Sequence, residues 1–262
     1  MTPTPDSSPG FPPVAVRSIP AARPLQWLAL GWRDLRRAGL ASLIHGVIVA
    51  LGGLLALMLA MRHWQLLPGV FSGFLLVGPI LATGLYALSR RLDQGERAGF
   101  RDVLAAWRCG CRPFVLMGLM LVAFGTVWVA LSATLFHFFV TADVTDTRAF
   151  LRYAVGQPDH LFVLWTVLGG LVAALVFALT VVSLPLMLDR RIPFDASLRA
   201  SVNAVAENPV PMAVWAVLIM VATGLSMATF MAGFVLSIPV IGHATWHAYR
   251  DTLDPGDIPV RT

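Results

Sequence analysis

Residues 209–249 read PVPMAVWAVLIMVATGLSMATFMAGFVLSIPVIGHATWHAY, forty-one consecutive positions without Asp, Glu, Lys or Arg. A single helix of this length would measure about 60 Å, roughly twice the 30 Å thickness of the hydrocarbon layer of a membrane. The segment must therefore hold two membrane-spanning helices, and we expect the turn between them near residues 224–229. So long an apolar segment is stable in contact with lipid rather than with water.

The same pattern extends over most of the chain, which is 57% hydrophobic and only 13% charged. A soluble domain carries about twice that charged share. Six segments are long and apolar enough to span a membrane: 41–61, 66–89, 113–140, 161–188, 209–227 and 229–249. The sequence thus predicts an all-α polytopic membrane protein with one six-helix transmembrane domain over residues 25–253. Residues 1–24, rich in proline, are expected to form a disordered cytoplasmic tail, and residues 254–262 a short C-terminal tail.

The orientation follows from the basic residues, all 19 of which are arginine. Sixteen flank the predicted spans on one side, and the three on the other side are Arg62, Arg148 and Arg152. Loops on the cytoplasmic face are enriched in basic residues. We therefore expect both chain ends in the cytoplasm and the protein in a bacterial inner membrane. The arginines build no continuous face outside the membrane, which argues against nucleic-acid binding.

Three units of the sequence share one plan. Each begins with an aromatic residue close to an aspartate, at Trp32, Phe100 and Phe194, and continues into a short amphipathic segment that is typical of helices lying in the membrane interface. Two predicted spans follow, and the second span of each unit contains a proline: Pro79, Pro185 and Pro239. This predicts three pseudo-repeats, each an interfacial helix plus a hairpin, with kinked even-numbered helices. Simple packing geometry is the alternative explanation of the prolines.

The apolar cores contain no Asp, Glu, Arg or Lys, and this absence narrows the functional classes. Charged groups inside a membrane usually mark proton relays, ion pathways or coupling sites. Their absence argues against a proton- or sodium-coupled transporter and against membrane-embedded hydrolysis, so we expect no enzyme. A membrane-organising, lipid-interacting or passive transport protein remains, as does a channel or transporter not coupled to protons.

Histidines supply the candidate metal or haem ligands. His243 and His247 lie four residues apart on one helical face, and His45 is expected at a similar depth. Three imidazoles at one depth are a suitable ligand set for a metal ion or haem. The alternative is that the pair belongs to a belt of amphipathic side chains at the membrane surface, which requires no cofactor.

Membrane lipids are the expected partners. Residues suited to contact lipid headgroups combine guanidinium groups with amphipathic aromatic side chains. The candidates are Arg36, Arg37, Arg90, Arg91, Tyr86, Trp246, Tyr249 and Arg250.

Several short motifs carry a resemblance to a known family. They are LQWL at 25–28, GWRD at 31–34, VGP at 77–79, GLY at 84–86, SRRL at 89–92 and GHATWHAYR at 242–250. Over about residues 25–253 the chain resembles bacterial integral membrane proteins catalogued as domain-of-unknown-function family 2189. The resemblance implies an inner-membrane protein of proteobacterial type and brings no known activity. Some relatives carry a cytochrome oxidase subunit label, which this chain does not support, because it lacks the spread of buried histidines that two haems and copper need.

Overall fold

The computed structural model describes residues 11, 13–60, 78–108, 111–139, 149 and 160–261. Within them, four helices are long and apolar enough to cross a membrane, over Leu40–Leu59, Arg112–Phe138, His160–Asp189 and Pro209–Ala228. They correspond to helices α2 (Leu40–Ala60), α6 (Arg112–Phe139), α8 (His160–Thr180) with α9 (Ser183–Asp189), and α11 (Pro209–Ala228). The prediction of a helical membrane protein is confirmed at this level.

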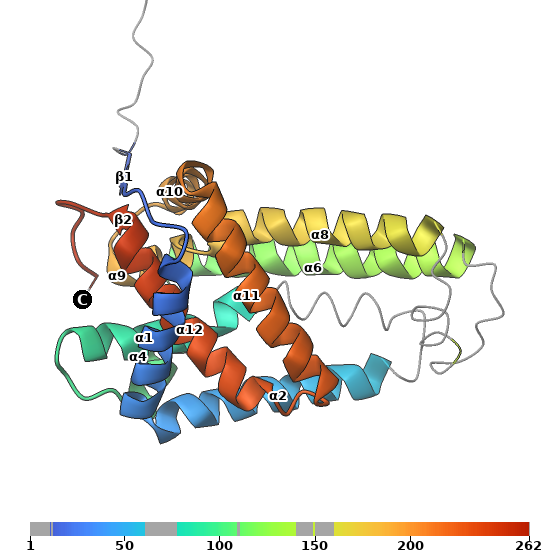
Figure 1. Ribbon diagram of the computed structural model, residues 1–262, viewed down its shortest axis with the longest axis horizontal. Helices are drawn as coiled ribbons and strands as arrows, with labels where there is room; N and C mark the ends of the chain where they lie inside the picture. Colours follow the sequence, from blue (N-terminus) through green and yellow to red (C-terminus); the bar gives the residue numbers. More distant parts are fainter. Residues whose placement is uncertain are drawn as a thin grey trace, which may run out of the picture.

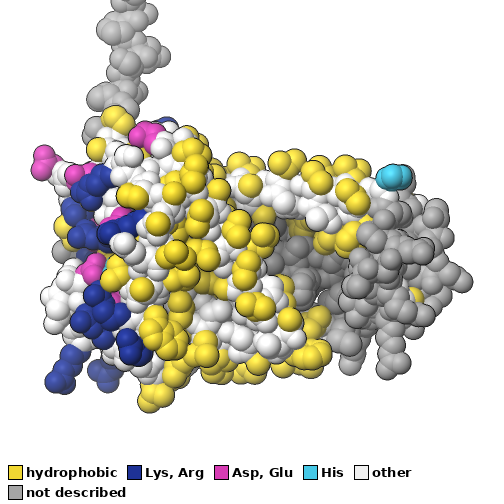
Figure 2. All heavy atoms as spheres, viewed as in Figure 1, with side chains coloured by type: hydrophobic (Ala, Val, Ile, Leu, Met, Phe, Trp, Pro, Cys, Tyr) yellow, Lys and Arg dark blue, Asp and Glu magenta, His cyan; other side chains and the backbone are white. Residues whose placement is uncertain are grey.

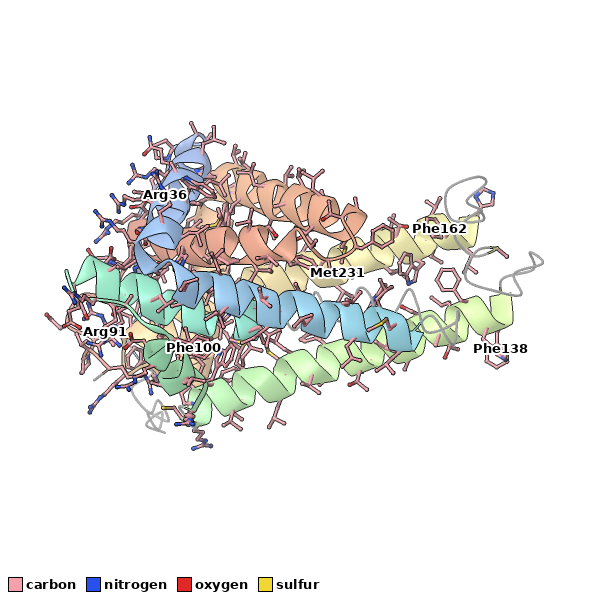
Figure 3. All side chains as sticks on the ribbon, turned by 90° about the horizontal axis from the view of Figure 1, so that it is seen from below. Arg36, Arg91, Phe100, Phe138, Phe162 and Met231 are labelled. Carbon is pink, nitrogen blue, oxygen red and sulfur yellow. The ribbon has the colours of Figure 1, made fainter. Side chains whose placement is uncertain are left out.

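The charged residues gather at one end of an elongated molecule. Arginines and carboxylates lie together at that end, and hydrophobic side chains cover the visible flank of the long helices (Figure 2). Arg36 and Arg91 lie at the charged end, while Phe138 and Phe162 lie at the opposite end (Figure 3). Exposed apolar side chains along α2, α6 and α8, such as Leu51, Leu119 and Leu171, give these helices the apolar surface that suits contact with lipid.

Shorter elements build the charged end. They are α1 (Arg23–Ala38), α4 (Thr83–Asp93), α5 (Phe100–Arg108), α9, α10 (Phe194–Glu207), β1 (Ala15–Val16) and β2 (Leu253–Asp254). The two strands pair antiparallel, with Ala15 opposite Asp254 and Val16 opposite Leu253. The segments before α1 and after α12 (Phe234–Thr252) therefore lie together at this end (Figure 1).

Helix α12 lies between α1, α2 and α4 and makes close contacts with each of them. A methyl group on Gly46 of α2 would overlap the carbonyl oxygen of Val235, and one on Gly31 of α1 would lie 2.5 Å from the carbonyl oxygen of Val240. A methyl group on Gly242 would similarly overlap the side chain of Leu85 in α4. Glycine at each crossing lets the helices approach until backbone meets backbone or side chain.

The turn that joins α11 to α12 lies later than expected. Helix α11 continues to Ala228, and α12 begins only at Phe234, so the turn occupies residues 229–233 rather than 224–229. Phe230 and Met231 take positive φ angles of 50° and 70°. The hydroxyl of Thr229 accepts a hydrogen bond of 2.9 Å from the backbone N–H of Gly233, which closes the turn. Gly224 lies inside α11, where nothing in its surroundings interrupts the helix.

Two of the six predicted spans, 66–89 and 229–249, are not among the four candidate spans found in the described residues. Residues 66–77 of the second span lie outside the described residues, and its last part is the 11-residue helix α4. Helix α12, which covers most of the predicted span 229–249, is not among the four helices that meet the length and hydropathy of a span. Pro239 lies within it without interrupting it, whereas α8 ends and α9 begins just before Pro185.

Candidate functional site

The second half of α12 carries a group of buried polar side chains. Every side chain from residue 242 to residue 249 is buried, and Arg250 is the first exposed residue after them. This segment holds His243, Trp246, His247 and Tyr249, all within the charged end of the molecule. The side chains expected to form a belt at the membrane surface therefore face inward, toward α1, α4 and α9.

A continuous chain of hydrogen bonds runs through His243. Its Nε2 atom lies 2.8 Å from the hydroxyl of Ser42 in α2, and its Nδ1 atom lies 2.7 Å from the hydroxyl of Ser89 in α4. Ser89 in turn donates a hydrogen bond of 2.9 Å to Oδ2 of Asp34 in α1. Since the single hydroxyl proton of Ser89 goes to the carboxylate, Nδ1 of His243 must be the donor to Ser89, and Ser42 donates to Nε2. The chain thereby fixes the tautomer of His243.

Asp34 accepts the last hydrogen bond of this chain, and it also makes a second contact, with His247. Nε2 of His247 lies 2.8 Å from the same Oδ2 atom. Burial alone would raise the pKa of Asp34, but the hydrogen bonds from His247 and Ser89 and the nearby histidines outweigh it, so the pKa lies below its ordinary value. The carboxylate is therefore ionised at neutral pH and holds α1, α4 and α12 together.

Two further carboxylates meet the aromatic side chains of α12. The indole N–H of Trp246 donates to Asp93 of α4 at 2.7 Å, and the hydroxyl of Tyr249 donates to Asp189 of α9 at 2.7 Å. Because a buried indole or phenol needs a hydrogen-bond partner, these aspartates specify how α12 packs. The end of α12 is a hub that joins α1, α4 and α9, each through one acidic residue.

The hub continues to the last residues of α12. Asp251 accepts hydrogen bonds from the guanidinium of Arg23, at 2.6 and 3.1 Å, and from the indole N–H of Trp27, at 2.7 Å. Burial would raise the pKa of Asp251, but Arg23 and Trp27 outweigh it and lower the pKa from its ordinary value of 3.8. The first turns of α1 are thus held to the end of α12.

We predict a pH-dependent effect of Arg23→Gln. At pH 7 the variant should lower the free energy of unfolding by about 0.5–1 kcal/mol, since the pair is partly exposed. A depressed carboxylate pKa contributes stability above the unfolded value and loses it as pH falls through the folded value, so the difference from wild type should shrink as the pH falls below 3.8. Thermal unfolding in detergent from pH 3 to pH 8 measures it. Arg37→Gln is the control, and a difference that persists undiminished at the acid end would contradict the assignment.

The three candidate metal ligands lie in the same region, and two of them are engaged with other side chains. In the described parts of the chain, no group of three or more His, Cys, Asp or Glu side chains is arranged to hold a metal ion. Both ring nitrogens of His243 are engaged with serine hydroxyls, and His247 faces Asp34. His45 is buried on the neighbouring α2, where its ring packs at 5.1 Å from that of Trp107.

The candidate headgroup residues divide into two groups. Tyr86, Trp246 and Tyr249 are buried, so they do not face a membrane surface in this structure. Arg90 turns inward to Asp189 at 3.3 Å, and Arg91 pairs with Glu96 and Asp102. Arg36, Arg37 and Arg250 are exposed.

Sequence reasoning did not find the partners of the two histidines. Ser42, Ser89 and Asp34 come from three other helices, and only the recurrence of Asp34 beside an aromatic residue marked it for attention. One signal was available: Asp34 follows Trp27 and Gly31 at helical spacing, and that face of α1 is the buried one. A carboxylate on a buried helical face requires a partner.

Comparison with known proteins supports the membrane assignment. Residues 66–189 match the model of the family described as "Predicted integral membrane protein (DUF2189)". No curated protein and no solved structure matches the chain. The resemblance is confirmed for residues 66–189, which include the motifs at 77–79, 84–86 and 89–92, whereas the motifs at 25–28, 31–34 and 242–250 lie outside the matched segment. With four helices able to cross a membrane, the chain is a multi-pass integral membrane protein.

Proposed function

We propose that this multi-pass membrane protein is non-enzymatic and binds the headgroups of anionic lipids, and so organises the lipid around it. The observation that carries the proposal is the state of Arg36 and Arg37 in the last turn of α1. Both are exposed, and among the described residues no carboxylate forms an ion pair with either. Most carboxylates of the charged end are occupied by arginine, histidine, tryptophan or tyrosine instead.

The surroundings of these arginines suit a membrane surface. Trp32, one turn before Arg36, exposes 45% of its surface, and Leu25 exposes 58%. An exposed tryptophan beside basic residues is typical of helices in the interface, with the ring at headgroup depth. One guanidinium group can bind two oxygens of a phosphate at once, and the C-terminal end of a helix favours positive charge. A lipid phosphate is the ligand that this combination recognises.

We also propose a topology for the chain in the membrane. Six spans, with the second over residues 66–89 and the sixth along α12, would leave sixteen arginines on the cytoplasmic side of a bacterial inner membrane. The pairing of β1 with β2 supports placing both chain ends on that side. The three pseudo-repeats with proline-kinked even helices belong to this proposal. Reporter fusions at Gly95 and after Arg261 test it, and a periplasmic signal from either one contradicts it.

Charge reversal at α1 tests lipid binding. The double variant Arg36→Glu/Arg37→Glu should lose bound phosphatidylglycerol, because each basic residue near an anionic surface contributes about 1 kcal/mol. Two removed contributions correspond to about 30-fold weaker binding. Native mass spectrometry of the full chain, from nanodiscs of defined phosphatidylglycerol content, counts the retained lipids.

The matched control changes the same total charge elsewhere. Arg17→Glu/Arg199→Glu alters two arginines that already pair with Asp254 and Asp195, so lipid retention should fall much less. Equal losses in both double variants would reduce the effect to net charge and contradict a site at α1. A Soret band, or a stoichiometric metal lost in His243→Ala, would instead favour the alternative of a metal or haem protein using His243, His247 and His45. Uncoupled flux in liposomes would favour a transporter or channel.

A further inference from the structure

Two arginines pair with the carboxylate of Asp189 at the end of α9, and a third, Arg261, contacts its backbone. Nε of Arg90 lies 3.3 Å from Oδ1, and Nε of Arg190 lies 3.0 Å from Oδ2. Arg261, near the C-terminal end, places its backbone N–H 2.8 Å from the carbonyl oxygen of Asp189. Asp189 also accepts the hydroxyl of Tyr249, so its oxygen atoms are already shared. We call Arg90, Arg190 and Arg261 with Asp189 the Asp189 cluster.

The C-terminal segment completes this cluster by docking along the residues that follow α9. The backbone N–H of Arg191 donates to the carbonyl of Pro259 at 2.8 Å, and the side chain of Arg190 donates to the carbonyl of Ile258 at 2.8 Å. Arg90 donates to the carbonyl oxygen of Arg261. The guanidinium of Arg261 lies 6.0 Å from the ring centroid of Phe114, in the first turn of α6. Residues far apart in sequence thus meet at the end of α9, where the guanidinium of Arg261 also donates to the carbonyl oxygen of Arg190 at 3.4 Å.

The hydrogen bonds of these guanidinium groups are incomplete. The Nε atoms of Arg90 and Arg261 are buried, and neither makes a hydrogen bond to the described residues; that of Arg90 has only its ion pair with Asp189. Buried donors without acceptors cost free energy, and native proteins rarely keep them. Arg90, Arg190 and Arg261 carry three positive charges against the one negative charge of Asp189; burial, and then the charges of Arg191 and Arg90, lower the pKa of Arg261. Asp254, the next acid near Arg190, is paired with Arg17.

We propose that the Asp189 cluster is a binding site for a phosphate group, held by the Nε–H donors of Arg90 and Arg261. A phosphate offers several acceptor oxygens at the spacing of guanidinium donors, and its negative charge offsets the excess of positive charge. The cation–π contact with Phe114 uses a face of the Arg261 guanidinium, whereas its Nε–H lies in the plane of the group and has no acceptor among the described residues. The phosphate belongs either to a lipid headgroup beside α6 or to a free phosphate compound. The site uses neither Arg36 nor Arg37 and therefore goes beyond the lipid contact proposed for α1.

The first arm of the test uses inorganic phosphate and the full chain in a neutral detergent, measured by isothermal titration calorimetry. Arg261→Gln should weaken phosphate binding at least tenfold. Arg199→Gln, which removes an exposed arginine paired with Asp195, should leave it unchanged. Arg90→Gln is the second variant, since Arg90 supplies the other donor without belonging to the C-terminal segment. Each variant is first required to unfold cooperatively on heating, which separates loss of the site from loss of the fold.

The second arm distinguishes the two sources of phosphate. Native mass spectrometry from nanodiscs of phosphatidylglycerol or phosphatidylcholine reports whether Arg261→Gln loses one bound anionic lipid. If Arg261→Gln loses the bound anionic lipid and the wild type does not bind free phosphate, the site is assigned to a headgroup. If Arg261→Gln loses binding of free phosphate, the site is assigned to a soluble compound. If Arg261→Gln and Arg90→Gln change neither measurement, the proposal is wrong. Arg36→Glu/Arg37→Glu should leave phosphate titration unaltered, so failure of the α1 contact and failure of this site give different results.

Discussion

Replacing Asp34 by alanine should lower the free energy of unfolding by about 3–5 kcal/mol, the range measured when one partner of a buried ion pair is removed. Asp34 is 1% exposed and accepts hydrogen bonds from Ser89 and His247 through one oxygen atom. The substitution leaves both donors buried without an acceptor. Without Asp34, the directions of the hydrogen bonds among Ser89, His243 and Ser42 are no longer fixed. Helices α1, α2, α4 and α12 then lose the contact that they share. Thermal unfolding in detergent, followed by tryptophan fluorescence, measures the change.

A surface carboxylate provides the control for this variant. Asp195 pairs with Arg199 on α10, and its side chain is 66% exposed. Because exposed ion pairs along one helix contribute little to stability, Asp195→Ala should be nearly neutral. Asp34→Asn should fall between the two, since the amide keeps the shape and one acceptor but loses the charge. Comparable stability of Asp34→Ala and Asp195→Ala would show that the buried chain does not hold the helices together.

The spans could be predicted because the membrane imposes a simple rule. Segments of about 20 residues without charge must be helical and must cross, since lipid offers backbone groups no partner. Four predicted spans match helices of the structure, and most of their ends agree within one or two residues. They are 41–61, 113–140, 161–188 and 209–227. The predicted span 229–249 is less clear-cut, because α12 combines an apolar first half with a buried polar second half, and hydropathy averages over both.

The partners within the site could not be predicted, because they depend on which helices pack together. The spacing of His243 and His247 shows that they share a face, but Ser89 lies 154 residues from His243, and Asp34 lies 213 residues from His247. Trp246 suits a headgroup layer as well as it suits a buried aspartate, since both environments accept an indole N–H. Only the packing of α12 against α1, α2 and α4 decides between them.

That packing leads to the second large effect, at the glycine where α2 crosses α12. Gly46→Ala should lower the free energy of unfolding by about 1–3 kcal/mol, the usual cost of overfilling a well-packed interior. The added methyl group would overlap the backbone carbonyl of Val235, and backbone cannot move aside as a flexible side chain can. The helices would have to separate, which also lengthens the contact between Ser42 of α2 and His243 of α12. Helix propensity acts in the opposite direction, because alanine is favoured over glycine in a helix by about 1 kcal/mol.

The same helix supplies the matched control, which isolates the crossing from propensity. Gly52 lies in α2 six residues further on, and a methyl group there would meet nothing within 4 Å. Gly52→Ala should therefore be neutral or stabilising by up to about 1 kcal/mol, so the two variants should differ in sign. Denaturation of both proteins in mixed detergent micelles gives the comparison. If Gly46→Ala proved as stable as Gly52→Ala, α2 and α12 would not meet backbone to backbone. The hydrogen bond between Ser42 and His243 would then lose its structural basis, since it requires that close approach.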